Sequence, residues 1–489
     1  MNTSRIGLLL GPLLFILIFQ FVSPEGLSRE GVALLAITAW IATWWITEAI
    51  PIAATALLPL LLFPLTGVSG IKETSLAYSD PMVLLYMGGF MIAVSIEKWN
   101  LHKRIALNII AFMGTDLNKI ILGFMIATAF LSMWISNTAT SLMMLPIAIA
   151  VVSQLGNQSL DESLAETTIG RALMLGIAYG ASIGGMATII GTPTNIILVG
   201  VIKKSFGVEI GFSQWMMIGL PISVILLVIC WYYLVNIAFD LTLAKQTKGG
   251  KEEIDEQLKA LGSISKQEKR VLWVFLGVST AWICRTFLLQ PLIPVLDDTI
   301  IALTGVMLLF VLPSGEGNNK KLLGWDVAEK IPWGILILFG GGLTLASGFQ
   351  VTGLAQWIGE QFILVQNIPF WLFLLIIIAA VNFLTEITSN VATASMLLPI
   401  LAAVALAMNV HPYGLMVGAT FAASCAFMLP VATPPNAVVF GSGYLTIPAM
   451  IRAGIWMNVI SIVVVVLITL FLLPAVWQIN LGIYPEFLK

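Results

Sequence analysis

Long apolar runs separated by short polar islands make up most of this chain. A membrane-spanning helix needs about 20 apolar residues, and nine runs of roughly this length predict spans at 6–22, 31–49, 51–67, 80–97, 212–238, 271–289, 297–313, 331–350 and 447–474. Four further runs are interrupted by polar residues: 120–152 at Ser136–Thr138, 171–202 at 191–195, 368–408 at Ser389–Val391 and 412–444 at 432–436. The pattern predicts an all-α polytopic membrane protein.

The four polar islands form two matched pairs. Ser136-Asn137-Thr138 recurs as Ser389-Asn390-Val391, and Thr192-Pro193-Thr194-Asn195 recurs as Thr433-Pro434-Pro435-Asn436. The offset between the copies is 253 residues for the first pair and 241 for the second. Weak internal similarity of this kind is typical of transporter repeats. We therefore expect a duplicated unit of five elements preceded by one additional N-terminal helix.

Composition agrees with a membrane location. Of 489 residues, 59% are hydrophobic and only 10% are charged, which excludes an ordinary soluble domain. The three cysteines (Cys230, Cys284 and Cys425) are far apart in apolar runs, so neither a disulfide framework nor a metal cluster is expected. No small-residue cleavage site follows the first apolar run, which we interpret as a membrane span rather than a signal peptide.

Lysine and arginine in the loops predict the orientation. Basic residues gather between Lys98 and Lys119, in the polar segment 245–270, and between Lys320 and Lys330. These segments are all cytoplasmic if the N-terminus is inside and 120–152 is a re-entrant hairpin. The second hairpin, 368–408, then enters from outside, so the repeats are inverted. Lys203 and Lys204 fall on the outer side and count against this orientation. We interpret 245–270 as an amphipathic cytoplasmic linker.

The islands carry the chemistry of an ion-coupled anion site. Helix ends inside a membrane expose carbonyls that suit Na⁺ and N–H groups that suit a carboxylate. No Lys or Arg lies between Lys119 and Arg171 or between Lys330 and Arg452. A buried dianion without a counter-charge is costly, so co-bound sodium is favoured over anion exchange. Of the acids, Glu48 and Glu386 lie in apolar runs, as either site or structural residues.

Other functions are disfavoured. Small polar residues in an apolar run often only pack helices together, but recurrence at matched positions favours binding. An intramembrane hydrolase would need a nucleophile and a base, for which Ser442 and His411 are the candidates; nothing in the sequence orients His411, which we expect to start a helix. Inverted repeats with broken helices suit alternating access better than a channel. We therefore expect no enzymatic activity and no nucleic-acid partner.

With the segment Trp45–Pro51, these motifs resemble the divalent anion/sodium symporter (DASS) family over nearly the whole chain. The resemblance implies eleven transmembrane helices, two re-entrant hairpins and a homodimer in a bacterial inner membrane, with the N-terminus cytoplasmic. It also implies an elevator mechanism, in which a transport domain slides against a scaffold. The corresponding division is 1–115 (scaffold), 116–240 (transport), 241–270 (linker), 271–360 (scaffold) and 361–489 (transport).

The resemblance also implies the site. One sodium ion would bind at Ser132, Ser136, Asn137 and Gly185, and a second at Thr385, Thr388, Asn390 and Ala432. The substrate carboxylates would meet Ser136, Asn137, Thr138, Ser389, Asn390, Val391, Thr433 and Pro434. Family substrates are C4-dicarboxylates such as succinate, malate and fumarate, with citrate, sulfate or dicarboxylate exchange as alternatives. Val391 replaces the hydroxyl of Thr138 by a methyl group, so we expect asymmetric contacts to the two carboxylates.

Overall fold

The computed structural model describes residues 3–114, 116–156, 162–239, 241, 251–315, 320–361 and 368–488. These residues are almost entirely helical, and their strand pairing is limited to one bridge between Pro313 and Lys321. The first half contains α1 (Thr3–Phe21), α2 (Arg29–Thr47), α3 (Ile52–Thr55), α4 (Leu58–Thr66), α5 (Ile71–Leu76), α6 (Pro81–Lys98), α7 (Leu101–Met113), α8 (Leu117–Ser132), α9 (Asn137–Gly156), α10 (Glu162–Gly185), α11 (Pro193–Phe206) and α12 (Phe212–Tyr233). The second contains α13 (Lys251–Leu261), α14 (Lys266–Cys284), α15 (Asp298–Val311), α16 (Trp325–Ala328), α17 (Trp333–Val351), α18 (Leu354–Gln361), α19 (Phe370–Leu384), α20 (Asn390–Ala407), α21 (Pro412–Ser424), α22 (Pro434–Phe440), α23 (Ile447–Leu467) and α24 (Leu473–Trp477).

The helices match the predicted polytopic architecture. In the described part of the chain, nine helical segments are long and apolar enough to cross a membrane. Two of them, α9 and α20, are arms of the predicted hairpins, and seven remain. Two shorter apolar segments (52–66 and 298–311) and the two broken helices complete a set of eleven. The protein is therefore an integral membrane protein.

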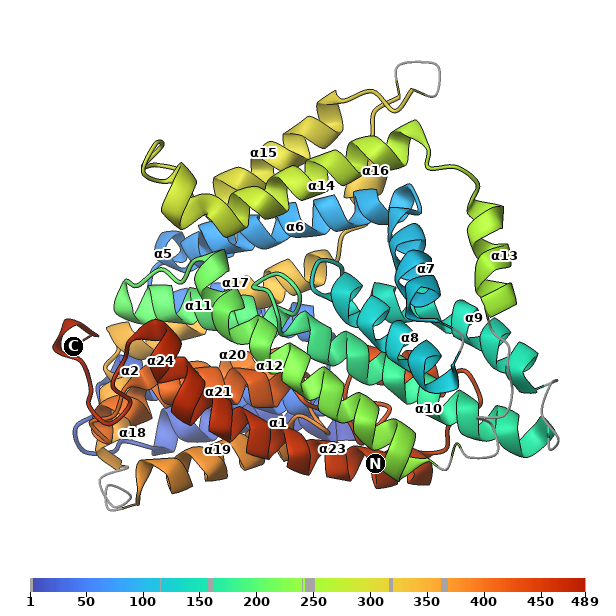
Figure 1. The fold of residues 1–489 in the computed structure, drawn as a ribbon. Coiled ribbons are helices and arrows are strands. Elements are labelled where there is room, and N and C mark those ends of the chain that lie inside the picture. Colours follow the sequence, from blue (N-terminus) through green and yellow to red (C-terminus); the bar gives the residue numbers. More distant parts are fainter. Residues whose placement is uncertain are drawn as a thin grey trace.

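Both predicted hairpins are present. Helices α8 and α9 are joined by the short turn 133–136, and α19 and α20 by the turn 385–389. The first hairpin lies toward one end of the molecule, beside α7 and α10, whereas α18 and α19 lie toward the opposite end (Figure 1). The hairpins thus approach the centre from opposite ends, as inverted repeats require.

The two broken helices are interrupted earlier than the sequence predicts. Helix α10 ends at Gly185 and α11 starts at Pro193, whereas the expected break was 191–195. In the second copy α21 ends at Ser424 and α22 starts at Pro434, against an expected 432–436. Proline is tolerated in the first turn of a helix because the N–H that it lacks would have no partner there. The two prolines therefore restart the chain as helix, and the breaks lie before them.

Segments expected to be loops form amphipathic helices. Helix α7 occupies the predicted basic loop after α6, and its apolar side, with Leu107 and Ile110, is buried. Helix α18 follows α17 in the same way, and Leu101 and Leu354, the first residues of α7 and α18, are also 253 residues apart. Helix α7 packs on α8, and α18 on α20, so each covers one hairpin. Helix α13, from the predicted linker, packs against α7 and α9.

Lys203, which counted against the predicted orientation, lies close to an acidic side chain. Its Nζ atom is 3.8 Å from Oε2 of Glu209, and Arg285 Nη1 donates to Oε1 of the same carboxylate at 2.8 Å. Burial disfavours the charged form of Glu209, but its hydrogen bond and ion pair with Arg285 outweigh this, so the pKa of Glu209 lies below its usual value. The charge of Lys203 is therefore partly balanced locally.

Candidate functional site

A cavity of about 430 Å³ lies where the two hairpin tips meet the two helix breaks. Its volume falls within the range of roughly 300–1,000 Å³ typical of small-molecule sites. All eight residues predicted to contact substrate line it: Ser136, Asn137, Thr138, Ser389, Asn390, Val391, Thr433 and Pro434. The repeated hairpin tips, 253 residues apart in sequence, and the repeated helix breaks, 241 residues apart, thus line the same cavity.

Other helices also contribute to the lining. They provide Glu48 at the end of α2, Ile52 at the start of α3, Tyr86 and Phe90 of α6, and Ile335 of α17. The rings of Tyr86 and Phe90 lie in contact, with centroids 4.3 Å apart. Sequence reasoning missed both aromatic residues, because nothing in α6 distinguishes a cavity-facing ring from one packed in the core.

Sequence reasoning also left Thr192 and Pro193 out of the predicted substrate contacts, although both line the cavity. The internal repeat contained the signal, since these residues are the counterparts of Thr433 and Pro434. The cavity therefore takes a Thr-Pro pair from each half of the chain.

The cavity contains no basic side chain among the described residues that line it. Glu48 is the only charged residue in this lining, and it caps α2 in a left-handed conformation with φ of 45°. Its negative charge makes an uncompensated anion still less favourable there. An anionic guest must therefore be balanced by helix ends and by cations bound with it.

Helix N-termini converge on the cavity. Helix α9 begins at Asn137 and α20 at Asn390, on the two hairpin tips, while α11 begins at Pro193. The side chain of Ser136 accepts a hydrogen bond from the backbone N–H of Ala139 at 3.2 Å, which caps α9. Free N–H groups and the positive end of the helix dipole favour a carboxylate at these positions.

Behind the first hairpin tip, several oxygen atoms crowd together. The Ser132 hydroxyl lies 2.5 Å from Oδ1 of Asn137 and 2.7 Å from the carbonyl oxygen of Ala181. A hydroxyl has one proton to donate, so it cannot satisfy both acceptors fully. An excess of acceptor oxygens at short range is the arrangement that a hard cation stabilises.

Two glycines let the backbone enter this cluster. A methyl group added to Gly185 would lie 2.7 Å from Oδ1 of Asn137, and one added to Gly191 would lie 2.5 Å from the carbonyl oxygen of Gly185 and 3.0 Å from that of Ser132. Any other residue would therefore displace the oxygens. These two glycines are required by close approach rather than by backbone angle.

The second hairpin repeats the cluster. The Thr385 hydroxyl lies 2.7 Å from Oδ1 of Asn390 and 3.0 Å from the carbonyl oxygen of Ala423. Thr385 and Asn390 are each 253 residues beyond Ser132 and Asn137. The internal repeat therefore extends from the sequence to individual interatomic contacts.

One predicted sodium ligand points elsewhere. The Thr388 hydroxyl donates to the carbonyl oxygen of Leu384 at 2.9 Å and lies 2.7 Å from the hydroxyl of Thr393. Its side chain lines a separate small cavity beside Trp45. The counterpart of Thr388 in the first repeat is Ile135, which has no hydroxyl. The Thr388 hydroxyl is therefore engaged with Leu384 and Thr393, whereas the resemblance implies that Thr388 is a sodium ligand.

Asn195 and Asn436, the paired asparagines of the two helix breaks, stabilise the backbone of the breaks by hydrogen bonds. Asn195 Nδ2 donates to the carbonyls of Gly185 and Thr188 at 3.1 and 2.7 Å, and Asn436 Nδ2 donates to those of Ala426 and Leu429 at 3.2 and 3.0 Å. Both side chains are fully buried. They satisfy carbonyls freed at the ends of α10 and α21.

Glu386 is a structural partner of the second break. Its carboxylate accepts hydrogen bonds from the backbone N–H groups of Phe427, Met428 and Leu429 at 2.7–3.0 Å, and from Asn458 Nδ2 at 2.7 Å. Glu386 does not line the cavity. Its counterpart in the first repeat is Met133, so this support exists in one half only.

The candidate hydrolase pair does not form. The Ser442 hydroxyl donates to the carbonyl of Val439 at 2.6 Å, while Nδ1 of His411 accepts from the backbone N–H of Tyr413 at 3.3 Å. His411 caps the start of α21, which confirms the helix-start interpretation. Among the residues that the structure describes, no group of His, Cys, Asp and Glu side chains could hold a metal ion.

Comparisons with known proteins agree with this architecture. The family model described as "Sodium:sulfate symporter transmembrane region" matches residues 3–479. The chain is 48% identical over 480 residues to a sodium-dependent dicarboxylate transporter, SdcS, of Staphylococcus saprophyticus, covering 97% of this chain and 92% of that protein. It is 46% identical over 483 residues to SdcS of Staphylococcus aureus, covering 98% and 92%.

Solved structures share the fold at low identity. Neisseria gonorrhoeae MtrF aligns with a TM-score of 0.58 at 14% identity, over 96% of this chain and 94% of that one. The YdaH transporter of Alcanivorax borkumensis aligns with a TM-score of 0.58 at 13% identity, over 95% and 98%. At such identities the likeness concerns the fold alone.

Proposed function

This chain belongs to the divalent anion/sodium symporter family, and from that premise we propose that it imports C4-dicarboxylates by coupling their uptake to the inward movement of sodium. Succinate, malate and fumarate are the proposed substrates. The bacterial cytoplasmic membrane, with the N-terminus inside, is the proposed location, since the similar proteins named above are staphylococcal.

The cavity between the two hairpin tips is the observation that carries this proposal. Its lining offers hydroxyls, amides and helix N-termini from both repeats, but no lysine or arginine among the described residues. Two such half-sites facing each other suit a molecule with a carboxylate at each end. Val391 offers a methyl group where Thr138 offers a hydroxyl, so one carboxylate has one donor fewer.

The oxygen clusters behind the tips support sodium coupling. In each cluster a hydroxyl lies near two acceptors, at 2.5 and 2.7 Å for Ser132 and at 2.7 and 3.0 Å for Thr385. Sodium at these positions would balance the negative charge of the bound dicarboxylate, and it would also fix the hairpin tips that bind the carboxylates. Binding of anion and sodium would then be mutually dependent, as symport requires.

We further propose that the hairpin tips and the helix breaks move together as one unit. The hairpins and broken helices fall in segments 116–240 and 361–489, whereas Glu48, Tyr86 and Ile335, which also line the cavity, fall in segments 1–115 and 271–360. A site divided in this way between two sets of helices suits an elevator in which the first set slides against the second. A homodimer held by the second set is part of the same proposal.

Transport in proteoliposomes tests the function. Succinate uptake is expected to require an inward Na⁺ gradient, and equal uptake in choline medium would refute the coupling. Asn137→Ala and Asn390→Ala are each expected to abolish uptake while the protein still folds. Wild-type rates in both variants would remove the site assignment. Citrate and sulfate as competitors separate dicarboxylate transport from the alternatives of tricarboxylate or sulfate transport.

A further inference from the structure

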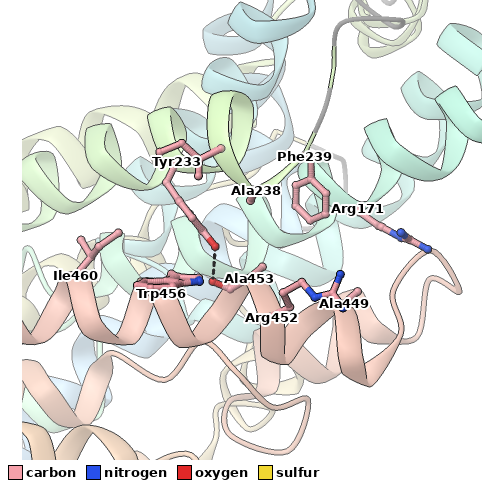
Figure 2. A pocket seen from close by; sticks show the side chains of 10 residues that line it. Arg171, Tyr233, Ala238, Phe239, Ala449, Arg452, Ala453, Trp456 and Ile460 are labelled. Atoms are coloured by element: carbon pink, nitrogen blue, oxygen red, sulfur yellow. Dashed lines mark hydrogen bonds between the residues drawn. The ribbon is translucent and has the colours of Figure 1, made fainter.

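A second cavity, of about 570 Å³, lies on the membrane-facing side of the molecule between α10, α23 and the π-helical extension of α12 at 234–238. It shares no lining residue with the cavity at the hairpin tips. The Tyr233 hydroxyl spans it and donates to the carbonyl of Ala453 at 3.0 Å (Figure 2). Helices α12 and α23 are therefore already joined at this point by a polar contact.

The cavity has a charged end and an apolar end. Figure 2 shows Arg171 and Arg452 toward one end, and Trp456 and Ile460 of α23 toward the other. Ile237 and Trp456 are 67% and 59% exposed and so face the surrounding lipid rather than the protein interior. Beyond Ile460, α23 continues with exposed apolar side chains, among them Val463. The surface along α23 therefore changes from basic at Arg452 to apolar at Ile460 and Val463.

Within the part of the chain that the structure describes, both arginines have donors without a hydrogen-bond partner. Arg171 Nε donates to the carbonyl of Tyr444 at 3.4 Å, and the other donors of its guanidinium group have no partner among the described residues. The ion pairs found within the described ranges involve neither Arg171 nor Arg452. Arg452 lies in the second turn of an apolar helical segment, Ile447–Trp477, long enough to span the membrane. A charge at that depth is stabilised when it reaches the headgroup level or meets an anion there.

We propose that this cavity binds an anionic glycerophospholipid. The headgroup phosphate would lie between the guanidinium groups of Arg171 and Arg452, since arginine is well suited to bind phosphate oxygens. One acyl chain would follow Trp456 and Ile460 along α23. A basic pocket between membrane helices is a recognised kind of site for such headgroups. The apolar continuation favours a lipid over free phosphate, which would use only the charged end.

A bound lipid would hold α10, α12 and α23 together. The three helices come from different parts of the chain, and α10 leads directly to the first helix break at Gly185. A ligand that binds only the folded protein stabilises it, and the stabilisation grows with the logarithm of the lipid concentration relative to its dissociation constant. We therefore expect anionic lipid to raise the thermal stability of the whole protein.

The test uses the full-length protein purified in detergent. Phosphatidylglycerol is expected to raise the melting temperature more than phosphatidylcholine with the same acyl chains. The double variant Arg171→Gln/Arg452→Gln should lose this difference, while a matched loss of charge elsewhere, Lys72→Gln/Lys204→Gln, should keep it. Native mass spectrometry should show phosphatidylglycerol retained by the wild type and reduced by about tenfold or more in the arginine variant, as expected for the loss of charge-assisted hydrogen bonds.

Several results would overturn the proposal. Equal stabilisation by both lipids would show that the arginines do not select an anionic headgroup. Equal stabilisation by inorganic phosphate and phosphatidylglycerol would assign the cavity to soluble anions. Equal losses in the arginine and lysine variants would indicate a general effect of charge. If the double variant fails to fold, the exposed Arg452→Gln single variant gives the same comparison, and the wild-type lipid comparison is unaffected.

Discussion

Replacing Thr385 by valine tests the sodium cluster of the second repeat with little change in shape. Thr385 is fully buried, and its hydroxyl lies 2.7 Å from Oδ1 of Asn390 and 3.0 Å from the carbonyl of Ala423. Valine substitutes a methyl group for the hydroxyl. It therefore removes one proposed sodium ligand and leaves the two acceptors facing an apolar group.

The loss should appear as weaker sodium dependence. Polar contacts to a charged group contribute roughly 1.5–3 kcal/mol, which corresponds to an increase of roughly 10- to 150-fold in the sodium concentration for half-maximal uptake. Because the proposed substrate needs sodium as its counter-charge, the succinate concentration for half-maximal uptake should rise as well when sodium is limiting. Saturating sodium should restore much of the rate.

The assay is succinate uptake into proteoliposomes as a function of external Na⁺, together with sodium-induced thermal stabilisation of the purified protein. Thr128→Val serves as the control, since the Thr128 hydroxyl is equally buried and bonds only within its own helix, to the carbonyl of Phe124 at 2.6 Å. Ser132→Ala should reproduce the effect in the first repeat. Unchanged sodium dependence in both Thr385→Val and Ser132→Ala would refute the assignment of the clusters as sodium sites.

Three further predictions concern other residues. Glu386→Gln replaces a carboxylate oxygen by an NH₂ group that faces backbone N–H donors. The free energy of unfolding, measured by thermal unfolding, should fall by about 2–4 kcal/mol, and sodium binding should weaken. Val391→Thr restores a hydroxyl to the cavity and should tighten dicarboxylate binding by roughly 2- to 10-fold, measured by competition against labelled succinate; weaker binding would show that the methyl group is in contact with the substrate. Burial lowers the pKa of the His411 imidazole to about 4. In the unfolded chain this imidazole has the usual histidine pKa of about 6.5. Stability should therefore fall as pH decreases from 6.5 toward 4, and His411→Asn, which retains an acceptor for the Tyr413 N–H, should lose this part of the pH dependence in thermal melts.

Much of the candidate site was accessible from the sequence because the two halves repeat. Ser136–Thr138 and Ser389–Val391 were identifiable as polar residues where a membrane helix has none, and their recurrence connected them to one another. The same comparison reached the Thr-Pro pair at 433–434 but was not applied to Thr192 and Pro193. In contrast, Tyr86 and Phe90 have no such signal, since an aromatic residue in an apolar helix is ordinary.

The positions of the breaks were predicted less well than their existence. The expected breaks, 191–195 and 432–436, contain Pro193 and Pro434, yet each of these prolines begins a new helix. The second interruption is stabilised by Glu386, a residue about forty positions away from the N–H groups that it accepts. A contact between residues so far apart in sequence depends on how α19 packs against α21. A local sequence pattern does not predict this packing.

The amino-acid sequence by itself determined the membrane location, the paired hairpins and the lack of basic residues around the islands, because these follow from hydropathy, repetition and residue type. Tertiary structure alone decided which oxygen atoms approach one another. It turned Asn195 and Asn436 toward carbonyls of their own breaks, directed the Thr388 hydroxyl away from the second cluster, and placed Arg171 near Arg452. The physical reason is that such contacts depend on the packing of distant helices, where a shift of a few ångströms separates a ligand from a neighbour.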